Sequence, residues 1–370
     1  MTSKGKTGRA VWAGICAAAV AAVLTTPAQA APEPPAPPAG TAPGGDRVWG
    51  LKDTGKDVRF RGLAAVGHRT AWAAGARGTV LRTGDGGRTW RDVSPPGAAG
   101  LEFRDIEAFD GRTAVVLAIG EGEASRIFRT GDGGTTWSES FRNTDPRAFY
   151  DCVAFFDRSH GLAMSDPVDG KYRIIATRDG GRSWRTLPST GMPAAQPGEA
   201  GFAASGQCLV TAGPRDVWLA TGGGADARVL HSADRGLNWT VATTPLPGGD
   251  PARGVFALAF RDRDHGIAVG GDYRTGQPSP RAAAVSRDGG RTWQPSATPP
   301  PAYRSGVAWL PRTRTAALAV GPTGTDLTLD AGRTWQTVDT GSFDTVDCAP
   351  TACWASGEKG RIARLEPGRR

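Results

Sequence analysis

The sequence predicts an all-β fold, a seven-bladed β-propeller closed by an N-terminal strand that completes the last blade. Three observations lead to this prediction. The motif Ser/Thr-x-Asp-x-Gly-x-x-Trp recurs six times at intervals of 42 to 55 residues, a period typical of one repeated supersecondary unit. Short β-rich segments fill the intervals, and the two ends of the chain carry complementary parts of one further unit.

The first 45 residues precede the repeats. Basic residues are followed by an apolar run at 10–24 and by Ala28-Gln29-Ala30, the order found in a secretory signal peptide, here 1–30. This run is too short to span a bilayer, and no later stretch reaches the length of a transmembrane helix. Residues 31–45 are Pro-rich and form a linker. We therefore expect residues 46–370 to be a single secreted propeller domain, extracellular or in the cell envelope.

The clearest repeat unit runs from 148 to 188. It reads FYDCVAFFD, a turn, LAMSD, a loop, YRIIATRDGG and SWRTLP, which is the pattern of four strands joined by hairpins. In this frame the recurring motif occupies the hairpin between the third and fourth strands. The motif-bearing units span 59–94, 101–141, 148–188, 201–244, 253–297 and 303–339.

The seventh unit is divided between the two ends of the chain. Residues 343–367 contain three strand-like segments and then stop. The missing strand is predicted near the N-terminus, because DRVWGLKDTG at 46–55 resembles GRTWQTVDTG at 332–341, with Trp49 matching Trp335. Joining the two ends would leave no open sheet edge.

The motif aspartates are interpreted as structural. A carboxylate at such a turn accepts N–H groups of its own loop, and the adjacent glycines adopt positive φ without steric cost. A calcium loop would need acidic groups at alternate positions, which the motif lacks, so no metal is expected. The six aspartates are Asp85, Asp132, Asp179, Asp234, Asp288 and Asp330.

Four cysteines follow the signal peptide. An even number in an exported protein predicts disulfides. Cys348 and Cys353 enclose a hairpin-sized loop and are expected to pair, which leaves Cys152 and Cys208 as partners by elimination.

The charge pattern argues against nucleic acid as a partner. The formal net charge is +8, but the arginines are scattered among turns instead of forming runs. We expect a monomer without nucleic-acid binding.

A ligand is expected on the face opposite the motif turns. FRG, FRD and YRS place Arg61, Arg104 and Arg304 at similar positions at the start of innermost strands, where guanidinium groups could grip a carboxylate. The alternative is that each arginine pairs with a nearby acid, such as Asp105 or Asp151, and only holds blades together. Acidic residues that complete the predicted ligand-binding set are Glu121, Glu123 and Asp151.

The same face carries residues that a glycoside hydrolase could use. Such an enzyme needs two carboxyl groups flanking the scissile bond, one with a raised pKa. The candidate catalytic residues are Asp166, Asp169, Glu199, Asp272 and Tyr273. We find no dinucleotide fingerprint and no haem or copper ligand cluster, so no cofactor is expected and an oxidoreductase function lacks a supporting motif.

The recurring motif resembles the Asp-box, or bacterial neuraminidase (BNR) repeat. With its regular spacing, the chain most resembles the photosystem II assembly and stability factor family, and also exported bacterial BNR-repeat proteins. The motif occurs in sialidases and xyloglucan-degrading hydrolases as well, so the resemblance implies the propeller and not one activity. The expected function is that of an exported binding module or scaffold that recognises a protein, or an anionic or sugar ligand, on the face opposite the motif turns. The alternative is a sialidase-like or other glycan-cleaving hydrolase.

Overall fold

The structure is a computed structural model that describes residues 49–274 and 278–366. All of these residues belong to the compact unit Gly45–Arg370. The signal peptide predicted at 1–30 and the linker predicted at 31–45 lie outside the described residues.

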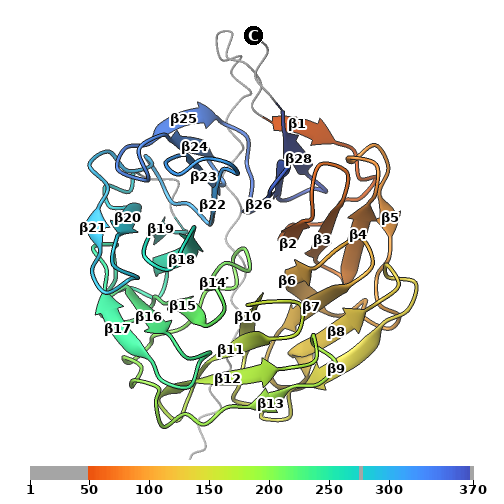
Figure 1. Cartoon of the computed structure of the whole chain (residues 1–370), viewed down its shortest axis with the longest axis horizontal. Coiled ribbons are helices and arrows are strands. Elements are labelled where there is room, and N and C mark those ends of the chain that lie inside the picture. The colour runs from red at the N-terminus through yellow and green to blue at the C-terminus, as the bar shows by residue number, and fades with distance from the viewer. Residues whose placement is uncertain (1–48, 275–277, 367–370) are drawn as a thin grey trace, which may run out of the picture. The chain divides into compact units, whose positions relative to one another are not determined.

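The described residues form seven four-stranded antiparallel sheets, here called blades 1 to 7, arranged as a ring (Figure 1). Within blades 1 to 6 the strand order from the innermost strand outward follows the order of the sequence. Blades 1 and 2 consist of β2 (Phe60–Ala65), β3 (Ala71–Gly75), β4 (Thr79–Thr83) and β5 (Arg91–Asp92), and of β6 (Glu102–Ala108), β7 (Ala114–Ile119), β8 (Arg126–Thr130) and β9 (Ser138–Arg142). Blades 3 and 4 consist of β10 (Tyr150–Phe155), β11 (Gly161–Val168), β12 (Lys171–Thr177) and β13 (Arg185–Thr186), and of β14 (Leu209–Ala212), β15 (Asp216–Ala220), β16 (Arg228–Ser232) and β17 (Thr240–Thr243). Blades 5 and 6 consist of β18 (Arg253–Phe260), β19 (Gly266–Asp272), β20 (Ala283–Ser286) and β21 (Gln294–Pro295), and of β22 (Gly306–Trp309), β23 (Ala317–Gly321), β24 (Gly324–Thr328) and β25 (Gln336–Asp339).

Blade 7 joins the two ends of the ring and confirms the predicted closure. It consists of β26 (Thr345–Ala349), β27 (Ala352–Ser356), β28 (Ile362–Leu365) and, as its outermost strand, β1 (Trp49–Lys52). β1 runs antiparallel to β28, with Trp49 opposite Leu365, and the two strands lie side by side in Figure 1. The Trp49 indole is buried and donates a hydrogen bond of 2.9 Å to Thr325 Oγ1 of blade 6.

The hydrophobic core lies between neighbouring blades. Large rings fill the wide outer part of these interfaces: Trp72 of blade 1 lies edge-on to Trp137 of blade 2, and Trp90 of blade 1 lies edge-on to Trp354 of blade 7. Near the axis neighbouring blades approach each other closely at glycines of the innermost strands. A Cβ on Gly62 would lie 3.2 Å from the backbone of blade 2. Each blade therefore needs both neighbours to bury its faces.

The six motif turns share one hydrogen-bond network. In the first turn, Thr83 Oγ1 donates to Asp85 Oδ1 (2.9 Å), while Thr89 donates to the same carboxylate from its N–H (3.0 Å) and from its hydroxyl (2.7 Å). The backbone and hydroxyl bonds from Thr89 lower the pKa of Asp85. The equivalent three bonds occur in the other five turns, in which Asn238 takes the place of Thr89 once.

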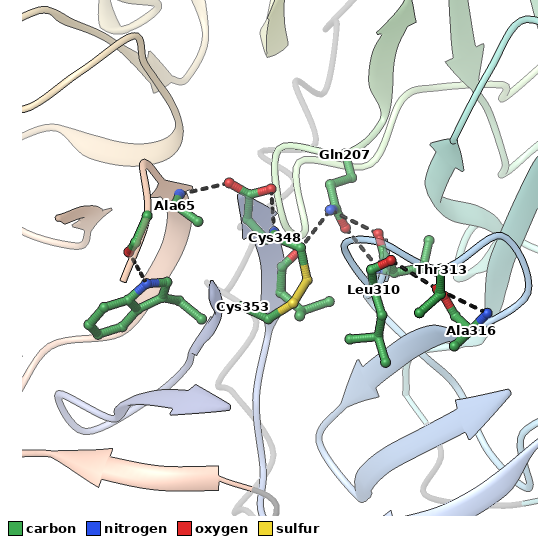
Figure 2. Close-up of a disulfide and its surroundings, with 12 residues drawn as sticks. Ala65, Gln207, Leu310, Thr313, Ala316, Cys348 and Cys353 are labelled. Atoms are coloured by element: carbon green, nitrogen blue, oxygen red, sulfur yellow. Dashed lines mark hydrogen bonds between the residues drawn. A yellow bond between two sulfur atoms is a disulfide. The ribbon is translucent and has the colours of Figure 1, made fainter. Parts of the chain in front are cut away.

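Disulfides join Cys152 to Cys208 and Cys348 to Cys353 within the described residues, which confirms both predicted pairs. Cys348 and Cys353 face each other across the β26–β27 hairpin, and Figure 2 shows their disulfide near the Gln207 side chain. Structural disulfides persist in oxidising compartments, so the pair favours such an environment for this protein. No helix within 49–274 and 278–366 is long and apolar enough to cross a membrane.

Replacing a motif aspartate should lower stability. Asp288→Ala removes the acceptor of hydrogen bonds from Ser286 and Thr292, and we expect the unfolding midpoint to fall by about 2–4 °C. Differential scanning calorimetry measures this shift. Asp264→Ala, in another turn of blade 5, is the control and should leave the midpoint unchanged. Equal midpoints for the two variants would contradict a structural role for the motif aspartate.

Candidate functional site

The innermost strands of four blades carry a β-bulge near their first residue. The antiparallel register skips one residue in β2, β6, β10 and β18, and the skipped residues are Arg61, Arg104, Asp151 and Phe256. A bulge turns the side chain of the extra residue out of the regular alternation. All four side chains line one cavity, together with Asp344, which directly precedes β26.

This cavity has a volume of about 640 Å³ and lies where the innermost strands begin. Ile119, at the end of the second strand β7, and Tyr273 and Pro322, in second-to-third strand connections, contribute to its wall. Each motif turn follows the third strand of its blade, and third strands run in the same direction as innermost strands. The motif turns therefore lie where innermost strands end, on the face opposite this cavity. The cavity is thus on the face that the sequence predicts for a ligand. Its lining residues are Arg59, Arg61, Arg104, Ile119, Phe149, Asp151, Asp166, Gly201, Phe202, Ala203, Ala204, Phe256, Tyr273, Tyr303, Pro322 and Asp344.

Residues 201–207, here called the floor segment, cross the axis beneath this cavity. Gly201 donates its N–H to Asp166 Oδ1 (2.7 Å), and Ala203 accepts a hydrogen bond from Arg104 Nη1 (2.8 Å). At the other end, the Gln207 side chain bonds the backbone of Val307 in blade 6 and of Val346 in blade 7 (Figure 2). The Cys152–Cys208 disulfide then attaches the end of the segment to β10. The segment is therefore fixed to blades on several sides of the axis.

Three arginines make one side of the cavity cationic. Arg59 is paired with Asp344 through bonds of 2.8 and 2.6 Å, and Arg104 Nε donates to Glu102 (2.9 Å). Arg61 differs: its Nε is buried without a hydrogen-bond partner among the described residues, and the Asp344 oxygen lies 3.9 Å away. Burial, together with the charges of Arg104 and Arg59, lowers the pKa of Arg61 to about 10. An anion in the cavity would supply the missing acceptor and offset this repulsion.

Two neighbouring carboxyl groups, those of Asp151 and Asp166, also line the cavity. Burial, reinforced by the charge of Asp166, raises the pKa of Asp151 well above its ordinary range. Burial also raises the pKa of Asp166 to about 6. The Asp151 Oδ2 atom has no hydrogen-bond partner in the described part of the chain. The pair can therefore hold a proton near neutral pH and donate it in a hydrogen bond.

Aromatic rings form a third wall. Phe202 of the floor segment stacks on Phe256 with ring centroids 4.0 Å apart, and Tyr303 meets Phe256 edge-on at 4.7 Å. Tyr273 stands at the rim, where 54% of its surface is exposed. The cavity thus combines an apolar wall with polar groups of both signs, a composition typical of small-molecule and peptide sites.

The structure brings together five of the residues predicted from sequence: Arg61, Arg104, Asp151, Asp166 and Tyr273. It also adds residues that the sequence analysis missed. Arg59, Tyr303 and Asp344 lie just outside the innermost strands, and Phe202 and Phe256 come from segments without a motif. An alignment of blade starts would have flagged Asp344, since it directly precedes β26.

The other predicted candidates are placed in ion pairs or backbone contacts outside the lining of this cavity. Arg304 is buried and donates to Asp326 (2.5 Å). Glu199 is buried against Arg228 and accepts a bond of 2.6 Å from Thr221. The remaining contacts are those of Asp169 with Arg147 (2.7 Å), Glu123 with Arg142 (3.3 Å), Asp272 with Arg253 and Arg274 (both 3.1 Å), and Glu121 in a β-bridge to Phe149.

Fold and cavity together define the class: a seven-bladed β-propeller with a polar and aromatic cavity at one end of its axis. The fold is similar to the solved structures of YCF48 bound to D1 peptide (16% identity, TM-score 0.61, 93% of this chain and 100% of that chain) and of YCF48 from Cyanidioschyzon merolae (15%, 0.56, 86% and 99%). It is also similar to the GH74 xyloglucanase from Xanthomonas campestris (18%, 0.54, 80% and 51%). Identities this low show the fold alone. No protein-family model and no curated protein matches the sequence.

The raised pKa of Asp166 predicts that the stability of the folded protein depends on pH. The folded protein holds this proton more tightly than the unfolded chain, so the free energy of unfolding should fall as pH rises from about 4 to about 6 and stay lower above that. Asp166→Asn cannot ionise but keeps an oxygen for the Gly201 N–H. We expect its unfolding midpoint to exceed that of wild type at pH 7.5 and to equal it at pH 4, measured by calorimetry.

The control is Asp169→Asn, a change of the same type at an exposed pair with Arg147. It should not gain stability at pH 7.5. A midpoint for Asp166→Asn below that of wild type at pH 7.5 would show that the ionised carboxylate stabilises the fold, against this interpretation.

Proposed function

We propose that this protein is an exported binding module whose axial cavity takes a carboxylate-bearing segment of a partner protein. The observation that carries the proposal is Arg61, which lines the cavity and whose buried Nε has no hydrogen-bond partner among the described residues. A buried donor of this kind is costly unless a ligand completes its hydrogen bonds. Export rests on the signal peptide predicted at 1–30 and agrees with the two disulfides.

The shape and chemistry of the cavity favour a peptide group over a free inorganic anion. Arg61 and Arg104 offer donors to a carboxylate, and the Phe202–Phe256 stack offers an apolar surface to an adjacent side chain. The carboxyl pair of Asp151 and Asp166 can donate or accept a hydrogen bond at a backbone amide. The similar structure of YCF48 was solved with a D1 peptide, so a propeller of this shape is able to hold a peptide.

A matched pair of small probes tests this proposal. N-acetylphenylalanine carries a carboxylate next to an aromatic ring, and its amide is neutral with the same shape. Titration calorimetry should show the acid binding at least about tenfold more tightly than the amide, because only the acid pairs with Arg61. Arg61→Gln should remove this preference.

Arg91→Gln, on the exposed outer strand of blade 1, is the control and should keep the preference. Equal binding of acid and amide by wild type, or a preference that survives in Arg61→Gln, would contradict the proposal.

A second candidate function is glycoside hydrolysis, favoured by the pKa of about 6 at Asp166, which suits a general acid. The similar GH74 xyloglucanase shows that the fold accommodates such an enzyme. However, of the other two carboxyl groups that line the cavity, Asp151 directly neighbours Asp166, and Asp344 is already held by two hydrogen bonds from Arg59. A general base needs to approach water or substrate freely, so we favour binding.

A panel of chromogenic glycosides separates the two functions. We expect no hydrolysis by the wild-type protein. Glycoside hydrolysis needs a second carboxylate on the other side of the scissile bond from Asp166, and among the described residues of the cavity none is both free and separate from Asp166. Hydrolysis that is abolished in Asp166→Ala and retained in Asp272→Ala would establish the hydrolase instead.

A further inference from the structure

A second cavity lies on the other side of the floor segment. It has a volume of about 270 Å³ and is bounded by Ser205, Gly206 and Gln207 of that segment. Its walls come from the later parts of innermost strands, including Ala65 of β2 and Ala108 of β6. These strands end toward the motif turns, so this cavity and the arginine-lined cavity lie at opposite ends of the axis.

This second cavity is acidic. Its lining contains Asp105 and Glu107 of β6 and Asp347 of β26, and no basic residue among the described ones. Asp105 accepts the Val153 N–H (2.7 Å), and Asp347 accepts the Ala65 N–H (2.7 Å; Figure 2). These two carboxyl groups therefore join neighbouring blades and hold their positions rigidly.

Two polar groups in the cavity remain without partners. Ser205 is 4% exposed, and its Oγ has no hydrogen-bond partner within the described residues. Glu107 is half-buried and forms no hydrogen bond or ion pair in that part of the chain. Burial, and then the charges of Asp105 and Asp347, raise the pKa of Glu107 well above its ordinary range. The Ser205 hydroxyl and the Glu107 carboxyl group could therefore both accept a hydrogen bond from a donor group of a ligand.

We propose that this acidic cavity binds a guanidinium group, with Glu107 as the principal partner and Ser205 Oγ as a further acceptor. The proposal is independent of the carboxylate site, because it concerns the opposite end of the axis and a ligand of opposite charge. A planar guanidinium offers several N–H donors in a fork that matches a carboxylate. A metal ion fits less well: the described residues contain no cluster of three ligating side chains, and the cavity is larger than a bare ion needs.

Binding of a cation should displace protons. Besides Glu107, the titratable groups facing the cavity are Asp105 on the same strand and Asp347 on β26, while β2, β10, β14 and the floor segment contribute none among the described lining residues. A cation stabilises the ionised form of Glu107 and lowers its raised pKa. The affinity should therefore increase as pH rises, with release of protons when the cation binds.

The test uses methylguanidinium and its neutral counterpart methylurea as probes of the full mature protein. Titration calorimetry should show binding of methylguanidinium and at least about tenfold weaker binding of methylurea. Measurements at pH 6 in two buffers of different ionisation enthalpy count the protons released. Glu107→Gln should weaken methylguanidinium binding at least about tenfold and abolish the buffer dependence.

Glu139→Gln, on the outermost strand of the same blade, is the matched control and should bind like wild type. Glu107→Gln should fold with an unfolding midpoint at least equal to that of wild type, because it removes a half-buried carboxyl group that lies near the charges of Asp105 and Asp347. If this variant does not fold, Ser205→Ala replaces it and should weaken binding several-fold.

Three results would overturn the proposal: no binding of methylguanidinium, equal binding of methylurea, or unchanged binding in the folded Glu107→Gln protein. Tight binding of Ca²⁺ that depends on Glu107 and excludes methylguanidinium would replace the proposed organic cation with a metal.

Discussion

The pairing of β1 with β28 is the constraint on which the rest of the structure depends. Each blade buries both of its faces against neighbours, so a ring with one gap would expose two apolar faces. The chain closes this gap with a strand from its other end, and Trp49 extends the contact to Thr325 of blade 6. In the closed ring the innermost strands of the first and last blades, β2 and β26, lie in contact, and Arg61 and Asp344 beside them line the same cavity.

The fold could be predicted because its signals are local and repeated. Each motif turn contains its own hydrogen-bond network, and the match between Trp49 and Trp335 identifies the strand that completes the ring. The positions of side chains near the axis are harder to predict from the sequence, because they depend on the register of strand pairing. The letters FRG and YRS align Arg304 with Arg61. In the structure, however, the residue equivalent to Gly62 is Gly306, because Gly62 pairs with Ala74 and Gly306 pairs with Val320 at the same position of the neighbouring strand. Arg304 is thus one residue earlier in the strand frame, and a shift of one residue turns a side chain to the other face.

The sequence analysis begins the fourth repeat unit at residue 201, whereas the structure begins blade 4 at Leu209 and leaves the floor segment in the connection before it. The connection between blades 3 and 4 is longer than the others and lacks a strand pattern. Its course across the axis is determined by contacts with distant parts of the chain, such as those of Gln207 with Val307 and Val346. No local pattern encodes these contacts. The Cys152–Cys208 bond was inferred from the number of cysteines, but its effect, which is to hold the end of this segment beside β10, required the fold.

The floor segment explains why two groups of opposite charge with unsatisfied hydrogen-bonding capacity, Arg61 and Glu107, persist near one axis. Arg104 and Asp105 are consecutive residues of β6, yet the first lines the cavity above the segment and the second lines the cavity below it. Because the segment lies between the two cavities, Arg61 on one side is kept apart from Glu107 on the other. Buried groups without partners reduce the stability of a folded protein. The fold accepts this cost at two places, and a ligand of the complementary charge would offset it at each.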